Sequence, residues 1–136
     1  MKITSVECYL GQFITMKINT DEGIYGWGEA GLAYGNSFEA AFGQCQDFAK
    51  LIIGMDPFDT EKIWEHLHRH TFWGMGGGVV ITSAMAAIDI ACWDIKAKPS
   101  AFPSTSCWAA RPIRSSAHTL LSCSSAGERI LRPRTA

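Results

Sequence analysis

The chain has 136 residues, of which 47% are hydrophobic, which is enough for one domain with a modest core. Its formal net charge is −1, so no whole-chain field attracts nucleic acid. No apolar run reaches the length of a membrane-spanning helix, and Met1-Lys2 leads directly into an alternating segment instead of a signal peptide. We therefore expect a cytoplasmic protein with neither a membrane nor a nucleic acid as partner.

Charge is divided unevenly between two parts of the chain. Residues 1–98 carry seven Lys or Arg against twelve Asp or Glu, a net charge of −5. Residues 99–136 carry five arginines against one acid, a net charge of +4, together with four of the five prolines. A segment rich in serine and proline buries too little apolar surface to offset its conformational entropy. We therefore expect one domain over residues 1–98 and a disordered tail over residues 99–136.

The cysteines argue against both a disulfide framework and a zinc site. There are five of them, an odd number, and no two have the spacing of a CxxC pair. Cys45 and Cys92 fall on apolar faces of expected helices, where cysteine acts as a small hydrophobic residue.

Three alternating segments at the start predict a small antiparallel sheet. Apolar and polar residues alternate strictly over Phe13–Asn19, as in a strand with one buried face. Lys2–Leu10 alternates more weakly and precedes it across a short link, and Ile24–Ala30 follows an Asp-Glu-Gly turn. Gly26 and Gly28 in the third segment indicate that another part of the chain approaches the backbone closely there.

Two helices are predicted next. Asn36 and Glu39 have the spacing of a capping box, and apolar residues then recur at helical spacing from Phe38 to Ile52. The pair Asp56-Pro57 is typical of an N-cap followed by a first helical residue, so a second helix is expected from there to about His70.

The third predicted helix has the strongest pattern. It follows a glycine-rich loop over Thr71–Val80, and its apolar residues recur every three or four positions over Ile81–Lys98 before Pro99 ends it. Three strands followed by three helices indicate the α+β class, with an antiparallel meander first.

Four stretches of this predicted domain occur together, in the same order, in one known family. They are the opening MKIT, INTDEGIYGWGEA (Ile18–Ala30), LIIGMDPFDTEKIW (Leu51–Trp64) and SAMAAIDIACWDIKAK (Ser83–Lys98). Together they resemble the N-terminal capping domain of the enolase superfamily, of the mandelate racemase and muconate-lactonizing type. Within that group the pattern looks closest to acid-sugar dehydratases such as galactonate and mannonate dehydratases.

The resemblance implies where the chemistry would take place. In that family, Mg²⁺ held by three carboxylates of a (β/α)₈ barrel stabilises the enediolate that forms when a Lys or His base removes the proton α to a carboxylate. The barrel is missing from this sequence, so we expect no catalytic residue and no metal ligand in the chain. The full-length relative would use Mg²⁺ and a sugar acid, in either a dehydration or a racemisation.

Two loops are the candidate functional elements, because the family's capping loops close over the barrel mouth and exclude water. Tyr34 and Asn36 lie in the first loop and can contact a polyhydroxy acid; the alternative is a plain loop in which Asn36 caps a helix. Trp73 and Met75 lie in the second loop and would form a wall of the substrate pocket. The alternative for this second loop is flexible backbone that packs against the missing domain.

Other polar residues favour structural interpretations. His66 and His70 share a face of the second expected helix, but the sequence there is not HExxH, so a solvated helix end is favoured over a metal site. His68 belongs to the same helix end. Glu29 and Asp89 are expected to form hydrogen bonds or to lie on a helix surface. The five arginines of the tail are interpreted as out-of-frame sequence, in preference to an arm that binds nucleic acid.

The sequence after Lys98 departs from the family pattern. The family there reads like ALGVPVYQLLGGK, whereas this chain reads PSAFPSTSCWAARP over residues 99–112. Codons compatible with Ser100–Pro112, read one base out of register, encode LGVPVYQLLGGKT. We therefore expect a single-base deletion near Lys98 and a truncated capping domain that is inactive alone. The alternative is a stand-alone, non-catalytic domain that binds a protein partner, or associates with itself, through the apolar face that the barrel would cover.

Overall fold

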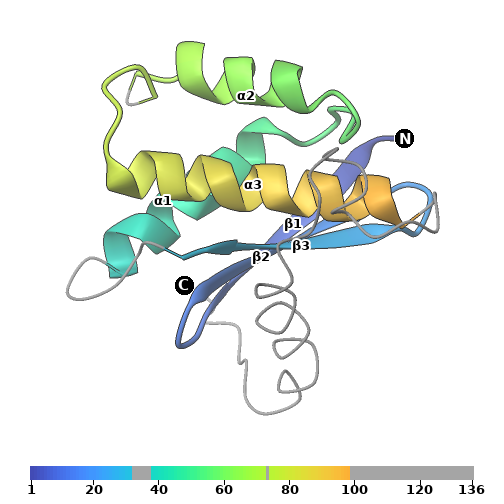
Figure 1. Cartoon of the computed structure of the whole chain (residues 1–136), viewed down its shortest axis with the longest axis horizontal. Coiled ribbons are helices and arrows are strands. Elements are labelled where there is room, and N and C mark those ends of the chain that lie inside the picture. Colours follow the sequence, from blue (N-terminus) through green and yellow to red (C-terminus); the bar gives the residue numbers. More distant parts are fainter. Residues whose placement is uncertain (32–37, 73, 99–136) are drawn as a thin grey trace, which may run out of the picture.

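A computed structural model describes residues 1–31, 38–72 and 74–98, which form a three-stranded sheet and three helices (Figure 1). In chain order the elements are β1 (Ile3–Leu10), β2 (Ile14–Thr20), β3 (Tyr25–Ala30), α1 (Phe38–Leu51), α2 (Thr60–Arg69) and α3 (Val79–Ala97). Helices α1 and α3 pack against one face of the sheet, and α2 packs on the outer side of α3. The predicted α+β order of three strands and then three helices is confirmed.

The sheet is an antiparallel meander in the order β1-β2-β3. Leu10 pairs with Ile14 across the first short link, and Ile18 pairs with Gly26 in the second hairpin. Gly23 turns the second hairpin with φ at 77°, a backbone conformation that L side chains rarely adopt. The strict alternation of the middle strand predicted its geometry, because Ile14, Met16 and Ile18 are all fully buried on the helix-covered face.

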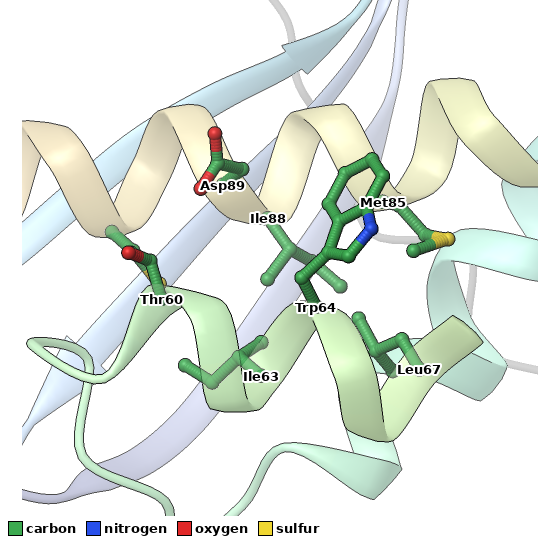
Figure 2. Close-up of a pocket in the computed structure, with 8 residues that line it drawn as sticks. Thr60, Ile63, Trp64, Leu67, Met85, Ile88 and Asp89 are labelled. Carbon is green, nitrogen blue, oxygen red and sulfur yellow. The ribbon is translucent and has the colours of Figure 1, made fainter. Parts of the chain in front are cut away.

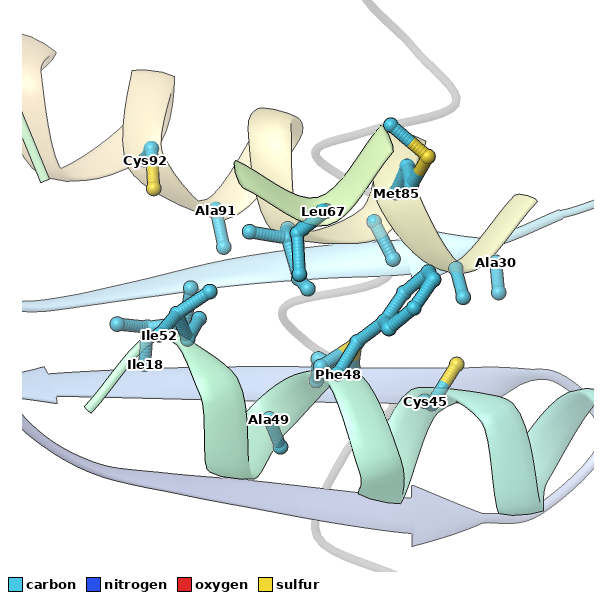
Figure 3. Packing of buried hydrophobic residues seen from close by; sticks show 14 of the residues in the cluster. Ile18, Ala30, Cys45, Phe48, Ala49, Ile52, Leu67, Met85, Ala91 and Cys92 are labelled. Atoms are coloured by element: carbon cyan, nitrogen blue, oxygen red, sulfur yellow. The ribbon is translucent and has the colours of Figure 1, made fainter. Parts of the chain in front are cut away.

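One apolar core joins the sheet to all three helices (Figure 3). Phe48 of α1 and Leu67 of α2 are buried in it, as are Met85 and the other apolar residues of the inner face of α3. Cys45 and Cys92 are buried as predicted, and together with Cys8 they are free thiols among the described residues. Because the three helices share this core, the position of each helix depends on the packing of the others.

Two glycines hold α3 directly against β3. A Cβ added to Gly28 would lie 1.8 Å from the backbone oxygen of Ala87, and a Cβ added to Gly26 would lie 2.1 Å from that of Ala91. Real Cβ atoms do not come this close to another heavy atom, so only glycine allows the two backbones to approach in this way. The close backbone approach expected from the sequence is therefore confirmed, and the element that approaches is α3.

The C-terminal end of α3 is tied to the outer edge of β3. The backbone N–H of Trp27 donates a hydrogen bond to Asp94 Oδ2 at 3.0 Å. The same carboxylate accepts from Lys98 Nζ at 2.8 Å, and Lys98 also donates to the backbone oxygen of Tyr25. The side chain of Asp94 thus satisfies a donor on an edge strand that no further strand pairs among the described residues.

The start of the second helix differs from the prediction. Asp56-Pro57 does not begin α2; instead the Asp56 side chain accepts the N–H of Phe58 at 3.0 Å and its carbonyl accepts the N–H of Asp59 at 3.1 Å. Helical hydrogen bonding begins only at Asp59, whose carbonyl accepts from Ile63 at 3.0 Å. Asp56 stabilises a local turn that competes with the helix, so the sequence signal for a helix cap lies three residues before the observed N-cap, Asp59.

The third helix begins slightly earlier than predicted, at Val79 and not at Ile81. The carbonyl of Gly78 accepts both the N–H of Thr82 at 3.0 Å and its hydroxyl at 2.9 Å, which starts the helix directly after the last glycine of the loop. The proposed capping box at Asn36 and the tail over residues 99–136 lie outside the described residues.

Candidate capping surface

The two predicted capping loops leave from one end of the domain. In Figure 1, α1 begins, α2 ends and α3 begins at the left of the view, where β3 also ends. Figure 3 also shows the end of β3 close to the first half of α3, since Ala30 lies beside Met85. This end of the domain is called the loop end below.

The second loop is anchored by a short hydrogen-bond chain. The Thr71 hydroxyl donates to the Leu67 carbonyl at 2.7 Å and accepts the N–H of Gly74 at 3.0 Å. Gly74 is buried, and a Cβ there would lie 2.4 Å from the Leu67 oxygen. The chain therefore turns tightly back onto the end of α2 at Gly74, and Met75 after it is exposed.

Three large apolar side chains are exposed at the loop end. Phe72 is 84% exposed, Met75 66% and Val79 59%. The sequence analysis named Met75, but it missed Phe72 and Val79, because neither interrupts the glycine-rich pattern that defined the loop. Apolar side chains gathered around one loop of a small domain are typical of a surface that another domain or molecule covers.

The other predicted capping residues, Tyr34, Asn36 and Trp73, lie outside the described residues. Of the four predicted substrate-facing residues, the structure therefore places Met75, on the exposed side of the loop that Gly74 anchors.

A narrow seam runs between α2 and α3 (Figure 2). Thr60, Ile63 and Trp64 of α2 face Ile88 and Asp89 of α3 across it. The seam leaves no space that a water molecule could fill, so it holds no ligand. Its role is to join the two helices.

Asp89 at this seam has an altered acidity. Partial burial raises the pKa of its carboxyl above the ordinary value of 3.8, and nearby Glu61 raises it further. Lys96 and a hydrogen bond from Trp93 act in the opposite direction but do not cancel the effect of burial. No space for a substrate adjoins Asp89, so the structure gives it the helix-surface position expected from the sequence.

The histidines lie where the sequence placed them, at the C-terminal end of α2. His66 and His70 share a face of the helix, and their ring centroids are 5.2 Å apart. His68, which lies between them in the sequence, is partly buried. Among residues 1–31, 38–72 and 74–98, no group of three or more His, Cys, Asp or Glu side chains could hold a metal ion. Over those same ranges, no helix is long and apolar enough to cross a bilayer.

The described cysteines are not reactive thiols. Burial raises the pKa of Cys8 to about 11 and that of Cys45 and Cys92 to about 12. Because the thiolate is the nucleophilic form, these groups stay protonated and unreactive near neutral pH.

The sequence pattern described as "Mandelate racemase / muconate lactonizing enzyme, N-terminal domain" matches residues 1–107 of the chain. The chain belongs to this family. The solved structures that it resembles are members of the enolase superfamily, and they match through the N-terminal part of this chain. The family match therefore extends past Lys98, where the motifs quoted from the sequence end.

Individual relatives point to dehydratases. The chain is 41% identical over 107 residues to a D-mannonate dehydratase from Novosphingobium aromaticivorans, covering 76% of this chain and 26% of that protein. It is 53% identical, with a TM-score of 0.69, to a candidate dehydratase from Zymomonas mobilis ZM4, covering 73% of this chain and 27% of that one. It is 32% identical, with a TM-score of 0.65, to an enolase from Pantoea ananatis with bound D-gluconate and Mg, covering 73% and 25%. The chain thus spans about a quarter of the length of the relatives it matches.

Proposed function

We propose that this chain is the substrate-capping part of a Mg²⁺-dependent acid-sugar dehydratase of the mandelate racemase and muconate-lactonizing family, and that it is inactive alone. A racemase or epimerase of the same family remains the alternative within this class. The observation that carries the proposal is the loop end, where Phe72, Met75 and Val79 are exposed around a loop that Gly74 anchors. In the proposed enzyme this apolar surface closes over a barrel mouth and excludes water from the sugar acid.

In the proposed division of labour, the groups that carry out this reaction lie outside the capping part. Removing a proton α to a carboxylate needs a base and a metal that stabilises the second negative charge, and hard cations such as Mg²⁺ take oxygen ligands. None of the described carboxylates gathers with two others into a set that could bind a metal. We infer that the base and the Mg²⁺ ligands belong to a barrel domain, and that Tyr34, Asn36, Trp73 and Met75 contribute only contacts to the substrate.

The substrate class rests on the relatives. A D-mannonate dehydratase and an enolase with bound D-gluconate and Mg are both similar to this chain at more than 30% identity. Both names refer to six-carbon polyhydroxy acids, so we propose a sugar acid of this kind as the substrate of the complete enzyme.

Turnover by the full chain tests this proposal. Purified protein is mixed with mannonate, galactonate and gluconate in the presence of Mg²⁺, with the Novosphingobium enzyme as the positive control. We expect no dehydration by the chain and normal dehydration by the control. Mg²⁺-dependent turnover by the chain, lost on addition of a chelator, would contradict the proposed division of labour between the capping part and the barrel.

We also propose a reason for the change of sequence after Lys98, namely a single-base deletion in the gene. The support is the out-of-register reading of Ser100–Pro112, which gives LGVPVYQLLGGKT, a typical family sequence at this point. Sequencing the gene across the codon for Lys98 tests it. Codons that do not spell this family sequence in either alternative frame would rule out the deletion.

A second candidate function is a non-catalytic domain that binds a protein partner through the loop end. The 84% exposure of Phe72 favours it, because exposed apolar clusters mark interaction sites. Analytical ultracentrifugation of the full chain and of Phe72→Ser separates the possibilities. Association that the substitution abolishes supports this candidate, whereas a wild-type chain that is monomeric and gains no stoichiometric partner in vivo argues against it.

A further inference from the structure

The imidazole rings of two histidines lie next to each other at the end of α2. His66 and His70 are one helical turn apart, and their Nδ1 atoms are separated by 3.4 Å. Their rings are nearly perpendicular, at 81°. The backbone under the pair is fixed, because the N–H of His70 donates to the carbonyl of His66 at 3.1 Å.

The separation of the two nitrogens matches the geometry of a shared metal ion. Two imidazole nitrogens bound at 2.0–2.1 Å to a tetrahedral Zn²⁺ lie about 3.3 to 3.4 Å apart. In the metal-free protein one ring can donate a hydrogen to the other across this distance. When both rings carry their hydrogen on Nε2, both Nδ1 lone pairs are free for a metal, and a neutral histidine changes tautomer without losing a proton.

We propose that His66 and His70 form a two-histidine chelating site for a borderline divalent metal ion, of which Zn²⁺ is the representative. Water completes the coordination shell, since the described residues provide no third ligand of the His, Cys, Asp or Glu type in a common group. His70 is exposed and His66 is partly exposed, so both the ion and its water have access.

The charges around the pair allow a cation to bind. Arg69, which lies between the two histidines in the sequence, forms an ion pair with Glu65 at 2.6 Å. The positive charge of Arg69 is therefore balanced, and its repulsion of an incoming cation is reduced. The proposal departs from the solvated helix end expected from the sequence, because the spacing alone does not reveal that the two nitrogens converge.

This site is chemically distinct from the Mg²⁺ of the proposed enzyme. Imidazole ligands suit Zn²⁺, Cu²⁺ and Ni²⁺, whereas Mg²⁺ prefers oxygen. The two proposals are therefore tested by different results. Absence of sugar-acid turnover in the complete enzyme would contradict the capping proposal alone, and absence of zinc binding would contradict the two-histidine site alone.

Isothermal titration of the untagged full chain with ZnCl₂ tests the site. The variants are His66→Gln and His70→Gln, with His68→Gln as the matched control on the same helix. Changes to outer-shell partners alone cost about 10–100-fold in metal affinity, so removal of a direct ligand is expected to weaken zinc binding by at least about 10-fold. His68→Gln is expected to bind zinc as the wild type does, and MgCl₂ is expected to give no heat from this site.

Thermal unfolding with and without ZnCl₂ provides a second readout. A metal that binds the native pair and not the unfolded chain raises Tm, and this rise is expected for the wild type and His68→Gln but not for His66→Gln or His70→Gln. Unchanged zinc affinity in the His66→Gln/His70→Gln double variant would overturn the proposal, because it would place the zinc elsewhere. Equal losses in all three single variants would overturn it as well.

Discussion

At the residue scale, the contact of two glycines with a helix backbone determines how closely α3 approaches the sheet. Gly26 and Gly28 lie under Ala91 and Ala87, and the alternation of glycine with aromatic residues in β3 places both glycines on the helix side. The sequence indicated that another part of the chain approaches the backbone of β3 at Gly26 and Gly28. It could not reveal which helix, because that depends on the arrangement of elements far apart in the chain.

Replacing Gly28 by alanine is expected to destabilise the domain by about 3 kcal/mol or more, because the new methyl group meets the fixed backbone oxygen of Ala87 and not a movable side chain. Gly43→Ala is the matched control. A Cβ at Gly43 meets nothing within 4 Å, and alanine favours the helix interior by roughly 0.5–1 kcal/mol. Urea denaturation of both variants measures the difference. Equal stability of the two would show that α3 can move away from the sheet without cost.

Asp89 gives a second residue-scale prediction, which concerns pH. Burial raises its folded-state pKa, so the folded state favours the neutral carboxyl and the charged form reduces stability. Ionisation of Asp89 therefore lowers the free energy of unfolding. This effect grows as pH rises from about the ordinary pKa of 3.8 through the raised pKa of the folded state. We expect Asp89→Asn to increase the free energy of unfolding at pH 7 and to lose this advantage as pH falls toward 4. A variant less stable than wild type at pH 7 would mean that the interactions with Lys96 and Trp93 dominate.

At the element scale, α3 is held at both ends by different means. Its start is set by the carbonyl of Gly78, and its end is joined to the edge of β3 through Asp94 and Lys98. This second connection holds the last turn of α3, up to Lys98, against the edge strand.

Asp94→Ala is expected to destabilise the domain by about 1–2 kcal/mol, because it removes a charged acceptor from the N–H of Trp27 and from Lys98. Asp47→Ala serves as the control. Asp47 pairs with Lys50 on the surface of α1 at 3.0 Å, and both side chains are more than two-thirds exposed, so its loss is expected to cost at most about 0.5 kcal/mol. Chemical denaturation distinguishes them. A similar small effect of both substitutions would indicate that the edge of β3 is satisfied by water instead.

The elements also show which parts of the fold were predictable. The strands and α3 followed from periodicity, because a half-buried strand and a helix packed on one side impose spacings of two and of three to four residues. The start of α2 could not be predicted from periodicity. Asp56 forms a local turn with Phe58 and Asp59, and this turn has the same sequence signature as a helix cap. For the site, the loop containing Met75 was identified by its position. Phe72 and the convergence of His66 with His70 required coordinates, because exposure and side-chain direction are not encoded in spacing.

At the scale of the whole molecule, the domain has a complete core and a surface that fits a role within a larger protein. The core joins the sheet to α1, α2 and α3, whereas the loop end exposes Phe72, Met75 and Val79. A domain that is internally well packed but apolar at one end matches the quarter-length coverage of its relatives. We propose that its contribution to the chemistry is to select the substrate and to exclude water.

The effect of Met75 belongs to this scale, because it appears only when a barrel is present. In a chimera in which residues 1–98 replace the matching segment of the Novosphingobium dehydratase, Met75→Ala is expected to raise KM for the sugar acid by about 10-fold while changing kcat less. Ile90→Ala, an exposed apolar residue of α3 outside the loop end, is the control and is expected to have a smaller effect. A fall in kcat with no change in KM would assign Met75 a role other than closing the pocket.

The most direct test of the capping role is the activity of that chimera without further substitution. The comparison is with the same dehydratase lacking its N-terminal segment, under identical Mg²⁺ and mannonate concentrations. The account predicts that residues 1–98 restore Mg²⁺-dependent dehydration that the shortened enzyme lacks. A folded chimera with no more activity than the shortened enzyme would contradict it.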